Sequence, residues 1–122
     1  MVGTTPDIDR WIDAFGERLS RRLRVDRILL FGSRARGAAL HESDVDLAVV
    51  SADFESMSWI ARAELLAREW GYGPDADCFG FTPNKLARAT NELTFPGQIR
   101  KTGVVVYPKK AADDAQSSNE GN

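Results

Sequence analysis

Two stretches of the sequence, VDRILLFGS at residues 25–33 and SDVDLAVV at residues 43–50, decide which fold the chain can adopt. The first is a continuous apolar run, which predicts a buried strand that stops at Gly32. The second predicts another strand over residues 45–50. Both strands are short and apolar, as expected for strands in the core of a small domain.

Helices and strands alternate along the rest of the chain. Apolar residues at spacings of three and four predict helices, and Ser or Thr-Pro before such a run predicts where they begin. The alternation indicates one α/β (α+β) domain with a mixed sheet flanked by helices. Helices are predicted over residues 6–23, from a short segment at Ser33, from Ser56 or Ser58 to Trp70, over 84–90 and, after an interruption at Pro96-Gly97, up to Lys101; further strands are predicted over 77–81 and 103–107.

The composition is that of an average globular protein. The chain has 122 residues, 43% of them hydrophobic and 28% charged, which is enough for one domain with its own core. We expect this domain over residues 1–108 and a disordered polar tail over residues 109–122. The single cysteine excludes an intrachain disulfide. Without a membrane-length apolar run or a signal peptide at the N-terminus, we expect a cytoplasmic protein.

The charge is uneven along the chain. Residues 41–80 hold nine acidic side chains and two Arg, whereas the segments 1–40 and 81–122 are net positive. An acidic segment is usually a solvated face, but it is also what a divalent metal ion requires. The formal net charge of −2 gives no support for direct binding to nucleic acid.

Gly32-Ser33 is the first motif that could carry chemistry. A glycine directly after a buried strand lets the backbone approach a ligand, and the amides of the following turn face an anion such as phosphate. The Ser33 hydroxyl could donate a hydrogen bond to a phosphate oxygen. Alone, such a pair is more often only a turn and a helix cap.

Asp44 and Asp46 form the second motif. Side chains alternate faces along a strand, so these two carboxylates project together while Val45, Leu47 and Val49 face the core. Adjacent carboxylates repel each other unless a cation lies between them, and Mg²⁺ prefers such oxygen ligands. For a lone Asp-x-Asp, a polar strand edge is the simpler alternative.

Asp77, at the start of the strand predicted over residues 77–81, could add a third carboxylate from a neighbouring strand. Asp75 has the same parity, but it lies near the Gly73-Pro74 turn, and a turn explains it more simply. A phosphate-binding turn, two carboxylates on one face and a third on another strand together fit two-metal phosphoryl transfer.

These motifs together resemble the signature of a known family. GSRARG at residues 32–37 and SDVDLAV at residues 43–49 are similar to the DNA polymerase β-like nucleotidyltransferases, above all the minimal nucleotidyltransferases of bacteria and archaea. Ten residues separate Ser33 from Asp44, a spacing typical of the adenylylating antitoxins in that group. The resemblance covers about residues 24–108 and implies a single domain similar to the polymerase β palm.

The resemblance also implies roles for particular residues. Asp44, Asp46 and Asp77 would be catalytic and would bind two Mg²⁺ ions. Asp77 would in addition be the general base that prepares the acceptor hydroxyl. Gly32 and Ser33 would hold the β- and γ-phosphates of ATP.

Several other residues have ordinary structural explanations. Arg34 or Arg36 could clamp the triphosphate with two hydrogen bonds, and a solvated helix start explains them equally well; we favour Arg36 as the binding residue. His41 is expected on a loop surface. Cys78 faces away from Asp77 on its strand and is expected to be a small core residue.

Two groups of aromatic residues leave more than one interpretation open. Trp59 and Trp70 share one predicted helix and are expected to face the core or a partner. Phe95-Pro96 could line an acceptor pocket or could simply pack within a loop.

The resemblance implies an Mg²⁺-dependent nucleotidyltransferase that transfers AMP from ATP to a hydroxyl of a partner protein and releases pyrophosphate. In 122 residues we expect no acceptor-binding domain of the kind that larger relatives carry. The family precedent is therefore a separate helical ribonuclease toxin of the HEPN type, whose tyrosine receives AMP, with this chain as its antitoxin. Two alternatives stay open, namely a non-catalytic module that neutralises its partner by binding, and a small-molecule transferase completed by a second subunit.

Overall fold

The computed structural model describes residues 6–32 and 45–109. The predicted alternation of helices and strands is confirmed there, while the short helix predicted from Ser33 and the tail beyond Lys109 lie outside the described residues. The elements follow in the order α1 (Pro6–Ser20), β1 (Arg27–Phe31), β2 (Val45–Val50), the 3₁₀ helix η1 (Ala52–Ser56), α2 (Trp59–Trp70), β3 (Ala76–Phe81), α3 (Pro83–Ala87), α4 (Phe95–Thr102) and β4 (Val104–Tyr107).

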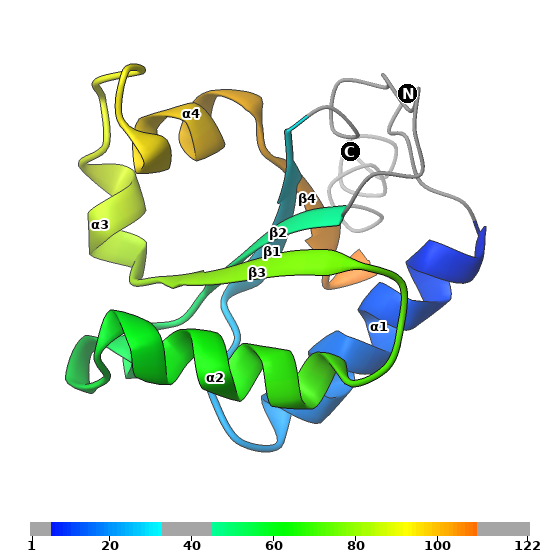
Figure 1. The fold of residues 1–122 in the computed structure, drawn as a ribbon. Coiled ribbons are helices and arrows are strands. Elements are labelled where there is room, and N and C mark those ends of the chain that lie inside the picture. Colours follow the sequence, from blue (N-terminus) through cyan, green and yellow to red (C-terminus); the bar gives the residue numbers. More distant parts are fainter. Residues whose placement is uncertain (1–5, 33–44, 110–122) are drawn as a thin grey trace, which may run out of the picture.

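The four described strands form one mixed sheet in the order β3-β2-β1-β4. β1 pairs antiparallel with β2 on one side and with β4 on the other. β2 and β3 are parallel, so the chain between them must cross from one end of the sheet to the other, and α2 makes this crossover. Figure 1 shows the sheet between two groups of helices, with α1 and α2 on one side and α3 and α4 on the other.

The face towards α1 and α2 is a closed apolar core. Alternate residues of β1 and β2 point into it, as predicted for the second strand. Helix α1 adds a stripe of apolar side chains at helical spacing. The buried residues of this core include Ile8, Ile12, Phe15, Leu19, Ile28, Leu30, Val45, Leu47, Val49, Leu66 and Trp70.

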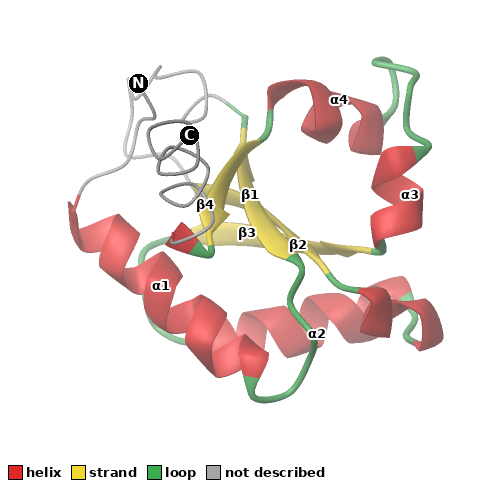
Figure 2. Cartoon of the chain, turned by 180° about the vertical axis from the view of Figure 1, so that it is seen from behind, coloured by secondary structure: helices red, strands yellow, loops and turns green. Residues whose placement is uncertain are grey.

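The face towards α3 and α4 has a smaller core. Helices α3 and α4 lie on this side of the sheet (Figure 2). Leu86 of α3 and Ile99 of α4 pack against the other set of alternate strand residues. Those strand residues are Leu29, Phe31, Ala48, Val50 and Phe81.

Ser and Thr side chains fix where the helices of both layers begin. The Ser58 hydroxyl accepts a hydrogen bond from the Ala61 amide at 3.0 Å, and the Thr82 hydroxyl accepts one from the Lys85 amide at 3.2 Å. Such caps satisfy amides that have no partner within the first helical turn. Among the helices that the structure describes, none combines the length and apolar character needed to cross a membrane.

The predicted interruption at Pro96-Gly97 is wrong, because both residues lie in the first turn of α4. Thr94 caps this helix and accepts a hydrogen bond from the Gly97 amide at 3.2 Å. Proline fits the first turn because its missing N–H would have had no helical partner there. Gly97 is needed for space, since a Cβ atom at this position would lie 1.9 Å from the Asn91 carbonyl oxygen.

Candidate functional site

Asp46 and Asp77 lie side by side on neighbouring strands. The parallel register of β2 and β3 pairs these two residues directly, so their side chains point to the same face of the sheet. Adjacent strands are about 4.8 Å apart, which brings the two carboxylates into one small region. Asp46 is half-buried and Asp77 is exposed, so the pair is accessible from solvent.

The two carboxylates lie at the end of their face that the described helices do not cover. They belong to the N-terminal ends of β2 and β3, whereas α3 and α4 gather towards the C-terminal ends of these strands (Figure 1). Asp75, the alternative to Asp77 in the sequence, precedes β3, and its backbone carbonyl accepts a hydrogen bond from the Val45 amide. The structure therefore places Asp77, rather than Asp75, within the strand that pairs with β2.

Gly32 brings the end of β1 against the Asp46 carboxylate. Its φ of +81° lies in the left-handed region that favours glycine. A Cβ atom at this position would lie 2.6 Å from Oδ2 of Asp46. Because Gly32 has no side chain, its backbone can lie directly against this carboxylate. The sequence predicted such a close approach of the backbone at Gly32, but to a ligand and not to Asp46.

The predicted site residues Ser33, Arg36 and Asp44 lie outside the described residues, as do Arg34 and His41. Within the described ranges, no three His, Cys, Asp or Glu side chains are grouped closely enough to hold a metal ion. The described part of the chain therefore contains two of the three predicted carboxylates, side by side.

The negative charge of this region also acts on Cys78, which directly follows Asp77 on β3 and points to the opposite face of the sheet. The pKa of its thiol is raised to about 12, first by burial and then by the charges of Asp77 and Asp46. The side chain packs against the α1/α2 core, as the sequence predicted. A thiol with such a pKa is protonated at neutral pH, so it is a packing residue and not a nucleophile.

The pair of carboxylates suits a hard divalent cation. Like charges in one small region repel each other, and Asp77 forms no ion pair with any of the described residues. Mg²⁺ takes one or two carboxylates, keeps several water molecules and binds substrate phosphates. Asp46 and Asp77 fit this donor set, and the Gly32 backbone lies directly against the Asp46 carboxylate.

An aromatic cluster lies next to the carboxylates on the same face. Phe79 follows Asp77 by two residues on β3, and its ring centroid is 5.0 Å from that of Phe95 on α4 and 6.1 Å from that of Trp59 on α2. Trp59 and Phe95 remain 47% and 43% exposed. The alternation of Asp77, Phe79 and Phe81 in the sequence indicates the part of the cluster that β3 contributes. Trp59 and Phe95, which pack against these rings, come from distant segments.

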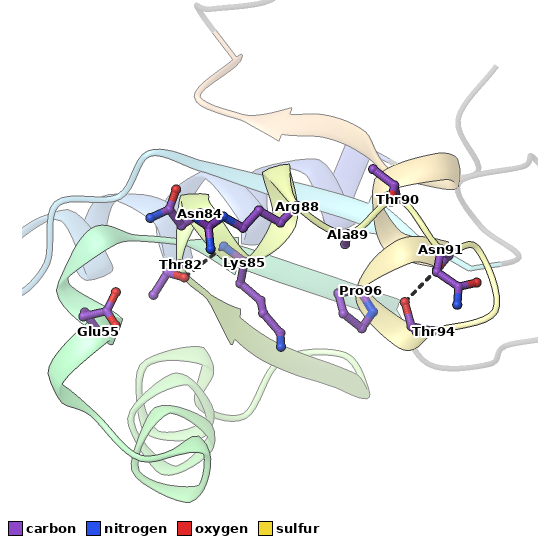
Figure 3. Close-up of a pocket in the computed structure, with 10 residues that line it drawn as sticks. All are labelled: Glu55, Thr82, Asn84, Lys85, Arg88, Ala89, Thr90, Asn91, Thr94 and Pro96. Carbon is purple, nitrogen blue, oxygen red and sulfur yellow. Dashed lines mark hydrogen bonds between the residues drawn. The ribbon is translucent and has the colours of Figure 1, made fainter.

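A groove of about 670 Å³ continues from the cluster, beyond the C-terminal end of β3. Thr82 and Pro96 line it, and each directly follows a residue of the aromatic cluster, Phe81 or Phe95. The side chain of Lys85 extends from α3 into the space between Thr82 and Pro96 (Figure 3). The remaining lining residues are Glu55, Asn84, Arg88, Ala89, Thr90, Asn91 and Thr94.

Comparison with known proteins identifies a family. A family model described as a nucleotidyltransferase domain matches residues 12–102, a range that includes Gly32, both described carboxylates and the groove. A comparison with curated proteins found no match.

Two solved structures are similar to this chain. One is a candidate nucleotidyltransferase from Sulfolobus solfataricus, with a TM-score of 0.60 and 21% identity over 80% of this chain and 77% of that one. The other is a toxin–antitoxin complex with AMP-PNP, with a TM-score of 0.55 and 26% identity over 88% of this chain and 78% of that one. The first likeness shows the fold alone, which is the nucleotidyltransferase fold predicted from the sequence.

Proposed function

The chain belongs to the nucleotidyltransferase domain family, and on this premise we propose that it transfers AMP from ATP to a hydroxyl of a partner protein. The observation that carries the proposal is the direct pairing of Asp46 with Asp77 beside the Gly32 backbone. In the proposed reaction, the acceptor oxygen forms a bond to the α-phosphorus of ATP. The bond from this phosphorus to the bridging oxygen breaks, and pyrophosphate leaves.

Magnesium is the proposed cofactor. Asp46 and Asp77, together with Asp44, would hold two Mg²⁺ ions. Bound there, the ions would neutralise triphosphate charge and stabilise the attacking and leaving oxygens. The adjacent carboxylates at an open part of the sheet support this assignment, because they offer the oxygen ligands that Mg²⁺ prefers.

The chain's own residues would bind and orient the two reactants. Gly32 would let the backbone approach the β- and γ-phosphates, and the Ser33 hydroxyl and the Arg36 guanidinium would donate hydrogen bonds to their oxygens. Asp77 would accept the proton of the acceptor hydroxyl, which makes that oxygen a better nucleophile. The exposure of Asp77 supports this role, since a general base must be reachable by the acceptor.

The proposed partner is a toxin, which the modification would inactivate. The support is the likeness to the toxin–antitoxin complex with AMP-PNP, an analogue of ATP. The resemblance of the sequence to adenylylating antitoxins adds a more specific expectation, that the toxin is of the HEPN type and receives AMP on a tyrosine.

The test is a transfer assay with α-³²P-labelled ATP, Mg²⁺ and the protein that copurifies with this chain. We expect Asp46→Asn to abolish labelling of that partner and leave the fold unchanged by circular dichroism. Glu64→Gln is the matched control, because it removes an exposed carboxylate from α2 without touching the site. Wild-type labelling by the Asp46→Asn protein would contradict the metal assignment.

The same variant separates catalysis from simple binding. If the chain neutralises a toxin by modifying it, Asp46→Asn expressed with the toxin gene in cells should fail to suppress toxicity. Full suppression by this variant would instead favour a binding module that acts without transfer.

A further inference from the structure

We infer that the groove beside α3 and α4 binds an acidic segment of the partner protein, and that this segment brings the acceptor hydroxyl to Asp77. The inference assigns Lys85 and Arg88 to partner binding. It rests on the proposed function, because that function determines the side from which the acceptor reaches the site.

The order of the strands sets this side. Gly32 follows β1, Asp46 belongs to β2 and Asp77 belongs to β3, so the proposed phosphate site and the proposed base lie on opposite sides of β2. In an in-line displacement, the attacking and leaving oxygens lie on opposite sides of the phosphorus. With pyrophosphate towards Gly32, the acceptor must come from the side of β3, which is an edge strand of the described sheet.

The groove lies on this side of the site, at the far end of the strand that carries Asp77. From Asp77 to Thr82, where the groove begins, the chain advances five residues along β3, or about 16 Å at the usual rise of a strand. The half-exposed rings of Trp59 and Phe95 pack against Phe79, which lies between Asp77 and Thr82 on the strand. A bound segment of about five extended residues would span this distance, with its hydroxyl at Asp77 and its far end in the groove.

The charges in the groove indicate which charge the far end of the bound segment carries. Lys85 and Arg88 are exposed, and neither forms an ion pair within the described part of the chain. Glu55 is the one acidic residue in the lining, and the other lining side chains are neutral. The groove is therefore net positive, and its free cations favour carboxylates of a partner segment.

The test is a titration of the ¹⁵N-labelled full chain, without ATP or Mg²⁺, followed by NMR. The probe is a synthetic peptide in which a tyrosine is followed, about five residues later, by a cluster of glutamates. We expect the amide signals of Thr82, Lys85, Thr90 and Thr94 to shift, and the binding to weaken as salt is added. A peptide with lysines in place of the glutamates is the negative control, and a DNA oligonucleotide of matched charge tests for general binding of polyanions.

Two charge-reversal variants make the result specific to the groove. Lys85→Glu/Arg88→Glu should weaken binding of the acidic peptide by about tenfold or more, because attraction becomes repulsion at both positions. Arg100→Glu is the matched control, since Arg100 is exposed on α4 but does not line this groove. All the altered side chains are on the surface, and the NMR spectrum of each variant reports directly whether it is folded.

Several results would overturn the inference. They are shifts confined to another surface or no shifts at all, equal binding of the lysine peptide or the oligonucleotide, and an equal loss of affinity in Arg100→Glu. Asp46→Asn should bind the peptide as the wild type does. Failure of the transfer assay alone would thus refute the proposed function, whereas failure of this titration would refute the groove assignment.

Discussion

The two faces of the sheet are built for different purposes. On the side of α1 and α2, residues such as Phe15 and Leu47 are fully buried, and the layer is closed by apolar packing. On the other side, Asp46 is half-buried, Asp77 is exposed and Phe95 is 43% exposed. The comparison teaches that one face carries most of the stability, while the other keeps charged and aromatic groups within reach of ligands.

The division between the two faces is tested by a substitution on the open face that lowers the transfer rate and leaves the stability unchanged. Asp77→Asn should lower the transfer rate by about 10²–10⁴-fold, the usual contribution of a general base. Because the side chain is exposed, the free energy of unfolding should change by less than about 0.5 kcal/mol. Single-turnover labelling and urea unfolding measure the two effects.

Asp75→Asn is the control for this variant, because it removes a carboxylate of the same kind two residues earlier and outside β3. Its transfer rate should stay at the wild-type level. If Asp75→Asn lost activity and Asp77→Asn kept it, the assignment of the third carboxylate would be wrong.

The closed face is tested by a large truncation in its core. Phe15 packs edge-on against Trp70, with ring centroids 5.0 Å apart. Phe15→Ala should therefore lower the free energy of unfolding by about 3–5 kcal/mol in urea titrations. Phe95→Ala on the open face removes the same ring from a half-exposed position and should cost about 1–2 kcal/mol. Equal losses would show that the two faces contribute alike.

The contact between the Gly32 backbone and the Asp46 carboxylate can be tested by comparing alanine substitutions at two glycines. Gly32→Ala combines an unfavourable φ with a Cβ atom placed 2.6 Å from a carboxylate oxygen, and we expect a loss of about 2–3 kcal/mol of stability. Gly71→Ala has a similar φ of +77° and nothing within 4 Å, so it should lose less, through backbone strain alone. Thermal unfolding measures both losses, and equal values would mean that the close approach has no cost.

Cys78 gives an effect that is expected only at alkaline pH. Its pKa of about 12 in the folded protein is above the ordinary value of 9.0, so the unfolded chain loses its proton first as pH rises. The thiol's contribution to stability is therefore present below about pH 9 and falls above it by about 1.4 kcal/mol per pH unit up to about pH 12.

Urea unfolding of the wild type and Cys78→Ala at pH 8 and pH 10 measures this contribution, because the other groups titrate alike in both proteins. The stability difference between them should shrink at pH 10. A difference independent of pH would show that the thiol is not buried beside the carboxylates.

Much of the fold follows from local features of the sequence. The strand Val45–Val50 matches its prediction at both ends, and Ser58, one of the two caps predicted for its helix, begins α2. Such features depend on a few neighbouring residues, which is why sequence reasoning finds them. The end of α1 at Ser20 rather than near residue 23, and the helix at Pro96-Gly97, depend on packing and capping that spacing alone does not reveal.

The site shows the same limit. Asp46 and Asp77 were predicted to meet because both begin strands, and the register of β2 and β3 places them opposite each other. The sequence left open that Phe95-Pro96 lines a pocket, but it did not predict the rest of the aromatic cluster and the groove. These combine α2, β3, α3 and α4, whose arrangement depends on the order of the strands. Long-range pairing of this kind leaves little trace in local sequence patterns.

The most direct test of the claim that the open face binds a metal–nucleotide substrate is thermal unfolding of the wild type and Asp46→Asn, each with Mg²⁺ and ATP. A ligand at a hundred times its dissociation constant stabilises a protein by about 2.7 kcal/mol. We predict a clear increase in Tm for the wild type that requires both Mg²⁺ and ATP and is absent in Asp46→Asn. An equal increase in both proteins, or none in the wild type, would contradict the account.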